Sequence, residues 1–251
     1  MSLEVVFFDL GSTLIYAKDP WPPVFVRADQ ELVKVLQRAG IPIDSQKFYD
    51  EFGTFIDAYY AQRSEDHVER TSFAALHGLL TGKGYAHVPQ PVLRAALDAM
   101  YSVTRGNWYA EDDAIPTLTT LKAQGYRLGM ISNASDDINV QYQVDQWGLR
   151  PYFDFVITSA ACGIRKPHPR IFQIALDYFK IQPEQAVMIG DTLSADVLGA
   201  NQLGIYSIWI TRRAELPPDG ALDIQPQAII SNLKDLPVLL ASIQRGEELG
   251  S

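Results

Sequence analysis

The sequence has one cysteine, Cys162, and it has no long hydrophobic run. A single cysteine excludes a disulfide framework and any zinc site built from several cysteines. No apolar segment approaches the roughly 18 residues of a membrane-spanning helix. The first residues, Met1-Ser2-Leu3-Glu4, have neither the basic region nor the apolar region of a secretory signal. We therefore expect a cytoplasmic protein without a membrane partner.

Positive charge is also scarce. The 21 lysines and arginines are outnumbered by 30 aspartates and glutamates, so the formal net charge is −9. Binding to nucleic acid through counterion release needs clustered Lys and Arg, so we expect no nucleic-acid partner. A small anionic substrate is still compatible with this charge, because a bound cation or one lysine can make a single site locally positive.

The remaining composition is that of a globular protein. Of the 251 residues, 47% are hydrophobic and 20% are charged. The 17 glycines and 15 prolines are close to average usage and exclude collagen or long disordered linkers. The length lies between one and two ordinary domains.

Short apolar runs followed by helical patterns recur along the chain and predict a parallel sheet. The expected strands are Val5–Phe8, Arg127–Ile131, Phe155–Thr158, Ala186–Ile189, Tyr206–Ile210 and a weaker Ala228–Ile230. The expected helices between them are Ala114–Gln124, Pro169–Phe179 and Ser194–Leu203, with proline or glycine at their ends. Repeated strand–helix–strand units indicate a doubly wound α/β sheet covered by helices on both faces.

Residues 17–110 interrupt this alternation. They contain four helical patterns and no convincing strand: Val24–Ala39, Asp44–Arg63, Thr71–Leu80 and Pro91–Val103. We therefore expect an α/β core from 1–16 and 111–251, with a small all-α domain inserted at 17–110. The apolar side of the second helix, with Phe48, Phe52, Phe55 and Tyr59, suits the core of the insert or a subunit contact. Both a monomer and a homodimer fit this pattern.

Polar residues stand at the ends of several expected strands. Asp9 ends the first strand, Ser132-Asn133 the second, and Gly190-Asp191 the fourth, with Asp196 shortly after it. Lys166 precedes the helix at Pro169. Each of these residues alone suits an ordinary turn or cap. Because ligands bind at the carboxyl ends of parallel strands, their joint placement favours a site.

These segments resemble the four motifs of the haloacid dehalogenase-like hydrolase superfamily. The motifs read Phe8-Asp9-Leu10-Gly11-Ser12-Thr13-Leu14, Ile131-Ser132-Asn133, Lys166-Pro167-His168-Pro169 and Ile189-Gly190-Asp191-Thr192-Leu193-Ser194-Ala195-Asp196. Their order and spacing agree with the family, and the insert is similar to the helical cap of one large branch. The resemblance implies a Rossmann-like catalytic core with this cap.

The resemblance also implies a nucleophile and a metal site. Asp9 would attack the phosphorus of a small phosphorylated metabolite and form an aspartyl-phosphate. Mg²⁺ would be held by Asp9, the backbone carbonyl of Gly11 and Asp191, with Asp196 as a more distant or occasional ligand. Carboxylates, a substrate phosphate and water are the ligands that Mg²⁺ prefers.

Further residues would hold the phosphoryl group. By the same resemblance, Ser132 and the backbone of Asn133 would bind a phosphate oxygen, and Lys166 would stabilise charge on the nucleophile and the phosphoryl group. Family members that displace halide from carbon need no metal and typically lack the Gly190-Asp191 pair. The intact pair therefore favours phosphate and magnesium over a 2-haloacid substrate.

The sequence departs from the family's phosphatases at Gly11. There a second aspartate usually protonates the leaving oxygen and later activates water, and such help is worth roughly 10²–10⁴-fold in rate. The first hypothesis is a phosphatase restricted to substrates with good leaving groups. Alternatively, the cap supplies the missing proton carrier, with His67, His77, Glu51 and Asp57 as candidates.

Two further functional hypotheses are compatible with the sequence, in addition to dehalogenation. One is a phosphate-binding or regulatory protein with weakened catalysis. The other is carbon–phosphorus cleavage, because phosphonoacetaldehyde hydrolases of this superfamily have a small residue at this place and form an imine on a cap lysine. Lys18, Lys34, Lys47 and Lys83 are the lysines available for that role.

Overall fold

The computed structural model describes residues 2–214 and 223–246, and the chain forms two compact units. The first unit consists of Met1–Tyr16, Ala110–Asn133 and Val144–Ser251. The second consists of Ala17–Tyr109 and Ala134–Gln143. Each unit has its own buried apolar core.

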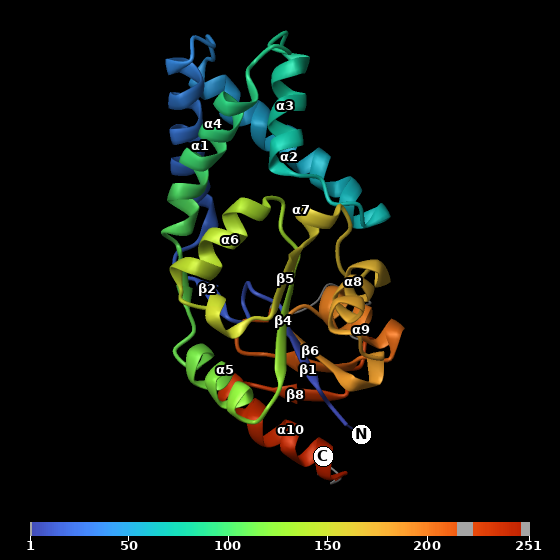
Figure 1. The fold of residues 1–251 in the computed structure, drawn as a ribbon. Helices are drawn as coiled ribbons and strands as arrows, with labels where there is room; N and C mark the ends of the chain where they lie inside the picture. Colours follow the sequence, from blue (N-terminus) through green and yellow to red (C-terminus); the bar gives the residue numbers. More distant parts are fainter. Residues whose placement is uncertain (1, 215–222, 247–251) are drawn as a thin grey trace. The chain divides into compact units, whose positions relative to one another are not determined.

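A six-stranded parallel sheet forms the centre of the first unit (Figure 1). Its order is β5-β4-β1-β6-β7-β8. The strands are β1 (Val5–Phe8), β4 (Arg127–Ser132), β5 (Phe155–Thr158), β6 (Ala186–Gly190), β7 (Tyr206–Ile210) and β8 (Ala228–Ile230). The predicted doubly wound α/β sheet is thereby confirmed, and strand order reverses beside β1, the usual place for a ligand site in such sheets.

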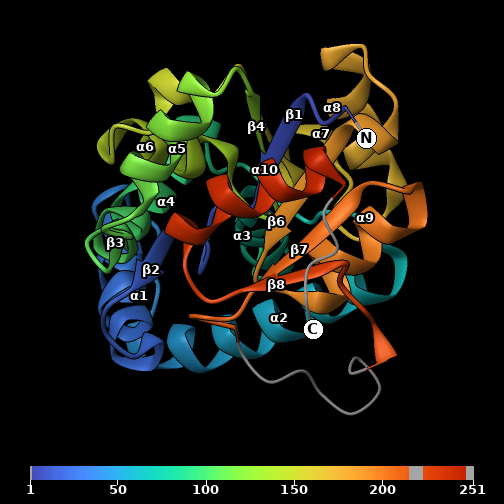
Figure 2. The ribbon, with the colours of Figure 1, turned by 90° about the horizontal axis from the view of Figure 1, so that it is seen from below.

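Helices cover both faces of this sheet (Figure 2). Val5 and Phe7 of β1 pack with residues of α8 and with Met188 of β6, because alternate side chains point to the same face. Val6 and Phe8 point to the other face and are also fully buried. Continuous apolar strands are typical of sheets buried on both sides.

The helices of this unit begin and end close to the expected residues. They are α5 (Ala114–Ala123), α7 (Ser159–Cys162), α8 (Pro169–Phe179), α9 (Leu198–Leu203) and α10 (Leu236–Arg245). Short 3₁₀ turns lie at Arg150–Tyr152, Pro183–Gln185 and Leu233–Asp235. The predicted helix from Ser194 differs in one respect: Leu193–Val197 is a π-helical turn, and the α-helix begins at Leu198.

The second unit is built from α1 (Trp21–Arg38), α2 (Ser45–Asp66), α3 (Ser72–Gly82) and α4 (Gln90–Arg105). All four were expected, with ends that differ by a few residues. Their buried side chains, among them Leu36, Phe48, Leu80 and Leu97, form a core of their own. Prolines occupy the first turns of α1 and α4, where the missing N–H has no helical partner to lose.

Two features of the chain differ from the sequence-based expectation. Residues 17–110 are not entirely helical, because β2 (Ile15–Ala17) and β3 (Trp108–Ala110) form a two-stranded sheet. In addition, residues 134–143 group with the helical unit rather than with the core, and they include the start of α6 (Asp137–Gln146). Three-residue strands are too short to show an alternating pattern, and the grouping of 134–143 depends on tertiary contacts.

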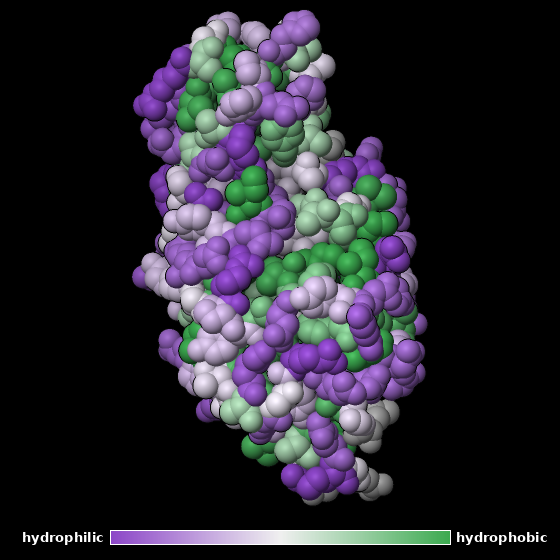
Figure 3. All heavy atoms as spheres, viewed as in Figure 1, coloured by the Kyte–Doolittle hydropathy of each residue, from purple (hydrophilic) through white to green (hydrophobic). Residues whose placement is uncertain are grey.

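None of the described helices is long and apolar enough to cross a membrane. On the face drawn in Figure 3, hydrophilic and hydrophobic residues are interspersed. Large exposed hydrophobic side chains are scattered over several elements, with Phe25 on α1, Tyr142 on α6, Tyr178 on α8 and Val238 on α10 among them. Single exposed apolar residues are normal on a protein surface.

Candidate active site

The predicted site residues lie at the carboxyl ends of neighbouring strands of the first unit. Asp9 follows β1, Ser132 is the last residue of β4, and Asp191 follows β6. Because β1 pairs in parallel with both β4 and β6, these strand ends are adjacent. The Asp9 N–H donates to the carbonyl of Ile189 at 2.9 Å, which extends the β1–β6 pairing to Asp9.

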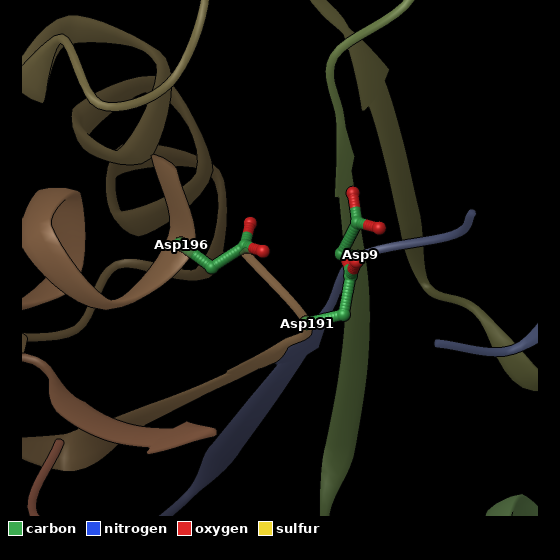
Figure 4. A group of neighbouring side chains, drawn as sticks. All are labelled: Asp9, Asp191 and Asp196. Atoms are coloured by element: carbon green, nitrogen blue, oxygen red, sulfur yellow. The ribbon is translucent and has the colours of Figure 1, made fainter. Parts of the chain in front are cut away.

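Three carboxylates converge at this edge. Asp9, Asp191 and Asp196 each offer an oxygen, and these oxygens all lie within 4.8 Å of one another. Figure 4 shows the Asp196 carboxylate pointing from its helical turn towards Asp9 and Asp191 at the strand ends. Asp9 and Asp196 are buried, whereas Asp191 is half-buried. The structure therefore brings the three predicted acidic residues together.

The Lys166 ammonium lies among these acids. It is 3% exposed and donates to Asp9 Oδ1 at 2.7 Å, Asp196 Oδ1 at 2.6 Å and the Ile131 carbonyl at 2.7 Å. An ammonium has three donors, so all of them are used in this geometry. Lys166 thus holds Asp9 and Asp196 in fixed positions, and its charge offsets part of their mutual repulsion.

Asn133 fixes the backbone of this lysine. Its side-chain amide accepts from the Lys166 N–H at 2.8 Å and donates to the Lys166 carbonyl at 3.0 Å. With the side-chain amide engaged in this way, a ligand would meet the backbone of Asn133, as the family resemblance implies. No local sequence pattern indicates the contact between Asn133 and Lys166, because 33 positions separate the two residues.

The peptide group that follows Asp191 is bonded at both of its ends. The Trp209 indole N–H donates to the Asp191 carbonyl at 2.8 Å, and the Thr192 N–H donates to Asp196 Oδ2 at 3.0 Å. Asp196 lies in the π-helical turn, a feature often found at functional sites. Trp209 was not among the predicted residues, because an aromatic residue inside a strand is an ordinary core residue.

Space around Gly190 is restricted by the same carboxylate. A Cβ at this position would lie 2.1 Å from Asp196 Oδ2 and 2.2 Å from its Cγ. A side chain at 190 would therefore collide with Asp196 as it is placed for Lys166. Glycine at position 190 therefore avoids a steric clash with the Asp196 carboxylate.

Burial and crowding shift the pKa values in the cluster. Burial raises the pKa of Asp191 to about 8, and the neighbouring Asp9 and Asp196 charges act in the same direction. Burial also raises the pKa of Asp9 to about 6, although Lys166 opposes the shift. For Lys166, burial acts to lower the pKa, but Asp196 and Asp9 outweigh it and the pKa is raised. Burial and mutual repulsion therefore disfavour the state in which all three carboxylates are ionised.

This donor set fits a hard divalent cation. Three carboxylates lie within 4.8 Å of one another, and the ligands are oxygen, as Mg²⁺ requires. Both Asp196 oxygens are already engaged, one by Lys166 and one by Thr192 N–H, which favours Asp9 and Asp191 as the direct protein ligands. A cation here would also favour the ionised form of these carboxylates.

The loop after Asp9 is a tight turn. The Leu14 and Ile15 N–H groups both donate to the Leu10 carbonyl, and Gly11 forms an isolated bridge with Ile15. Ser12 has φ 58°, an unusual backbone conformation for a residue other than glycine. Gly11 itself is not among the glycines with positive φ, so its backbone is open to other residues.

Known proteins resemble this chain over most of its length. A family described as haloacid dehalogenase-like hydrolase matches residues 3–204. The glyceraldehyde 3-phosphate phosphatase of Pyrococcus furiosus is 29% identical over 208 residues, covering 82% of this chain and 80% of the relative. The ribulose-1,5-bisphosphate 5-phosphatase of Halopiger xanaduensis is 29% identical over 214 residues, covering 81% of this chain and 82% of the relative.

A solved structure is also similar to this chain. The 2-haloacid dehalogenase of Pseudomonas syringae is 27% identical, with a TM-score of 0.68 over 96% of this chain and 99% of the other. The matched region 3–204 includes all four motifs and the acidic cluster built from them. The chain belongs to the haloacid dehalogenase-like hydrolase family, and it is a hydrolase.

Proposed function

We propose that this hydrolase is a Mg²⁺-dependent phosphatase acting on a small phosphorylated metabolite through an aspartyl-phosphate on Asp9. The observation that carries the proposal is the placement of Lys166 Nζ, 2.7 Å from Asp9 Oδ1, beside the Asp191 and Asp196 carboxylates. The proposal is further supported by relatives whose names specify glyceraldehyde 3-phosphate and ribulose-1,5-bisphosphate.

In the first step, an Asp9 carboxylate oxygen attacks phosphorus, and the bond between phosphorus and the ester oxygen breaks. The ester oxygen takes a proton from solvent water and leaves as an alcohol. Lys166 keeps Asp9 oriented and stabilises negative charge on the transferring group. The Ser132 hydroxyl and the Asn133 backbone N–H would donate to a phosphoryl oxygen. In the second step, water attacks the phosphorus of the aspartyl-phosphate and loses a proton to solvent, the bond between phosphorus and the Asp9 oxygen breaks, and inorganic phosphate leaves.

Asp9 and Asp191 would hold the magnesium ion, with the Gly11 carbonyl as a further oxygen. When bound, the ion supplies electrostatic stabilisation of the phosphoryl oxygens and neutralises the acidic cluster. Without such a cation, the approach of a phosphate dianion to three carboxylates would be opposed by charge repulsion.

The absence of a carboxylate at position 11 restricts the substrates. Gly11 supplies no proton, so an alkyl leaving group would depart unassisted by the usual acid. Acyl and aryl phosphates leave with less need of a proton. We therefore propose turnover that is fast for such compounds and slow for simple alkyl phosphates.

The helical unit offers few replacements for the missing acid. Glu51 is ion-paired with Lys83, and Lys47 Nζ lies 3.9 Å from the same carboxylate. His77 is exposed and His67 half-buried. The side chain of Asp57 lies outside the described residues. None of these observations singles out one residue as the proton carrier.

Carbon–phosphorus cleavage receives less support. An imine-forming lysine needs a lowered pKa, which usually comes from desolvation. Lys18, Lys34, Lys47 and Lys83 are all exposed. Lys34 pairs with Glu31 at 2.7 Å, and Lys83 pairs with Glu51. Borohydride trapping with phosphonoacetaldehyde would test this alternative, and a trapped lysine adduct would favour it.

Dehalogenation stays as an alternative because one similar structure is named a 2-haloacid dehalogenase. The intact Gly190-Asp191 pair, with Asp191 in the acidic cluster, favours the metal-dependent reaction. A screen should therefore measure phosphate release from phosphorylated metabolites and halide release from 2-haloacids, each with Mg²⁺ and with a chelator.

Asp9→Asn is the control for the screen. We expect phosphate release that requires Mg²⁺ and disappears in Asp9→Asn. Halide release that is indifferent to the chelator would replace the phosphatase proposal with dehalogenation. Magnesium-dependent binding of a phosphorylated compound with no phosphate release would instead identify a binding protein.

A further inference from the structure

We propose that Trp209 is a positioning residue for the metal site: its indole N–H holds the peptide group that links Asp191 to the turn carrying Asp196, and so keeps the two carboxylates in register. This inference rests on the proposed function, since it assigns Asp191 to Mg²⁺. Trp209 would touch neither the metal nor the substrate, and it would act through Asp191 alone.

The sheet register places Trp209 beside Asp191. β6 and β7 are parallel neighbours, and Trp209 is paired with Gly190, the last residue of β6. Asp191 is the first residue beyond that strand. From β7 the half-buried indole reaches the Asp191 carbonyl with an Nε1–O distance of 2.8 Å.

The other end of the same peptide group is bonded as well. The Thr192 N–H donates to Asp196 Oδ2 at 3.0 Å, and the second oxygen of Asp196 accepts from Lys166 Nζ at 2.6 Å. The Asp191–Thr192 peptide therefore bridges the sheet, through Trp209, and the charged cluster, through Asp196. With its carbonyl and its N–H both engaged, this peptide has little freedom to rotate.

Rotation of this peptide would change ψ of Asp191 and φ of Thr192, and thereby the position of the Asp191 side chain relative to Asp196 on the following turn. Indole is a donor without acceptor capacity, so the bond runs in one direction and no other group of Trp209 can replace it. Residues that orient metal ligands without touching the metal typically contribute 10–100-fold in metal affinity. We expect an effect of this size from the loss of the indole N–H.

Trp209→Phe removes this donor and keeps an aromatic ring in the strand. Magnesium binding by the purified full chain, measured by isothermal titration calorimetry, should weaken by roughly 10-fold or more. The Mg²⁺ concentration for half-maximal phosphate release should rise in parallel, with kcat at saturating Mg²⁺ changed much less. Trp147→Phe, the same substitution elsewhere in the first unit, should leave both quantities unchanged.

The outcomes separate the inference from the proposed function. If the wild type binds Mg²⁺ and Trp209→Phe binds it within twofold as tightly, the positioning role is wrong. If the wild type does not bind Mg²⁺, the proposed function and this inference fail together. A loss of kcat with unchanged Mg²⁺ affinity would also contradict a role through Asp191.

A measurement on the wild type covers the case in which Trp209→Phe does not fold. The four tryptophans give four indole N–H resonances in a ¹⁵N-labelled sample. The Trp209 resonance can be assigned by elimination from Trp21→Phe, Trp108→Phe and Trp147→Phe samples, and it should shift with the midpoint of Mg²⁺ binding. If no indole resonance shifts at saturating Mg²⁺, Trp209 is not linked to the metal site.

Discussion

The Lys166 ammonium bridges Asp9 and Asp196, with distances of 2.7 Å and 2.6 Å to one oxygen of each. All three side chains are buried, so the lysine is both a structural counter-ion and the cation nearest the proposed nucleophile. Removing it should therefore affect stability and catalysis together.

Lys166→Met tests this double role. The substitution leaves two buried carboxylates unpaired, and breaking a buried ion pair in this way costs about 3–5 kcal/mol of stability. Phosphate release should fall by roughly 10²-fold or more, because charge on the transferring group loses its stabilisation. Urea unfolding at pH 7 and pH 5 should show a smaller stability loss at pH 5, because burial raises the pKa of Asp9 to about 6 and this carboxylate takes up a proton. Equal losses at both pH values would mean that packing, not charge, is responsible.

Gly11→Asp tests whether an acid is all that is missing. The backbone at Gly11 is not in the left-handed region, so an aspartate is compatible with it. Turnover of alkyl phosphates should rise, with general acid–base catalysis setting a scale of roughly 10²–10⁴-fold. Turnover of aryl phosphates should change less. The increase should vanish in the double variant with Asp9→Asn; if Gly11→Asp stays at background and Asp9→Asn alone changes nothing, the phosphatase proposal is wrong.

Gly190→Ala tests the steric relation between Gly190 and Asp196. The added Cβ would lie 2.1 Å from Asp196 Oδ2, so the carboxylate or the strand must move. We expect about 1–3 kcal/mol of lost stability, as for other overpacked sites, together with weaker catalysis because Asp196 no longer holds Lys166. Gly53→Ala on α2 is the matched control, since nothing lies within 4 Å of its Cβ position. That control should be neutral or stabilising by up to about 1 kcal/mol, and a loss as large as that of Gly190→Ala would refute the steric account.

The raised pKa of Asp29 on α1 predicts that the stability of the folded chain depends on pH. Burial raises its pKa from 3.8 to about 6, so the folded chain binds this proton more tightly than the unfolded chain. Stability therefore decreases as the pH rises through the interval between these values. Asp29→Asn should gain on the order of 1–2 kcal/mol at pH 7.5, after allowance for partial solvent screening. Urea unfolding should show the gain disappearing below about pH 4; a gain that is the same at both pH values would contradict the titration.

Most of the core could be predicted because its signals are local. The mainly apolar runs at Val5–Phe8, Phe155–Thr158 and Tyr206–Ile210 coincide with β1, β5 and β7, since short apolar runs suit the strands of a sheet covered on both faces. The convergence of Asp9, Asp191 and Asp196 followed from parallel strand order, because polar residues at adjacent carboxyl ends must meet.

Other elements had no readable local signal. β2 and β3 are three residues each and are stabilised by pairing between segments about ninety positions apart. The π-helical turn at Leu193–Val197 reads in sequence as the start of an ordinary helix. Segment 134–143 joins the helical unit through contacts such as Arg94 with Asp136, which no periodicity reveals.

Local patterns in the sequence specify the residue types of the site and the strand ends at which they stand, because each motif directly follows or precedes a recognisable strand or helix. How those residues are held depends on tertiary contacts. The Asn133 amide on Lys166, the Asp196 carboxylate over Gly190 and the Trp209 indole on Asp191 are hydrogen bonds and close contacts between different elements. Such contacts depend on directions and distances between strands, which a linear pattern of apolar and polar residues does not specify.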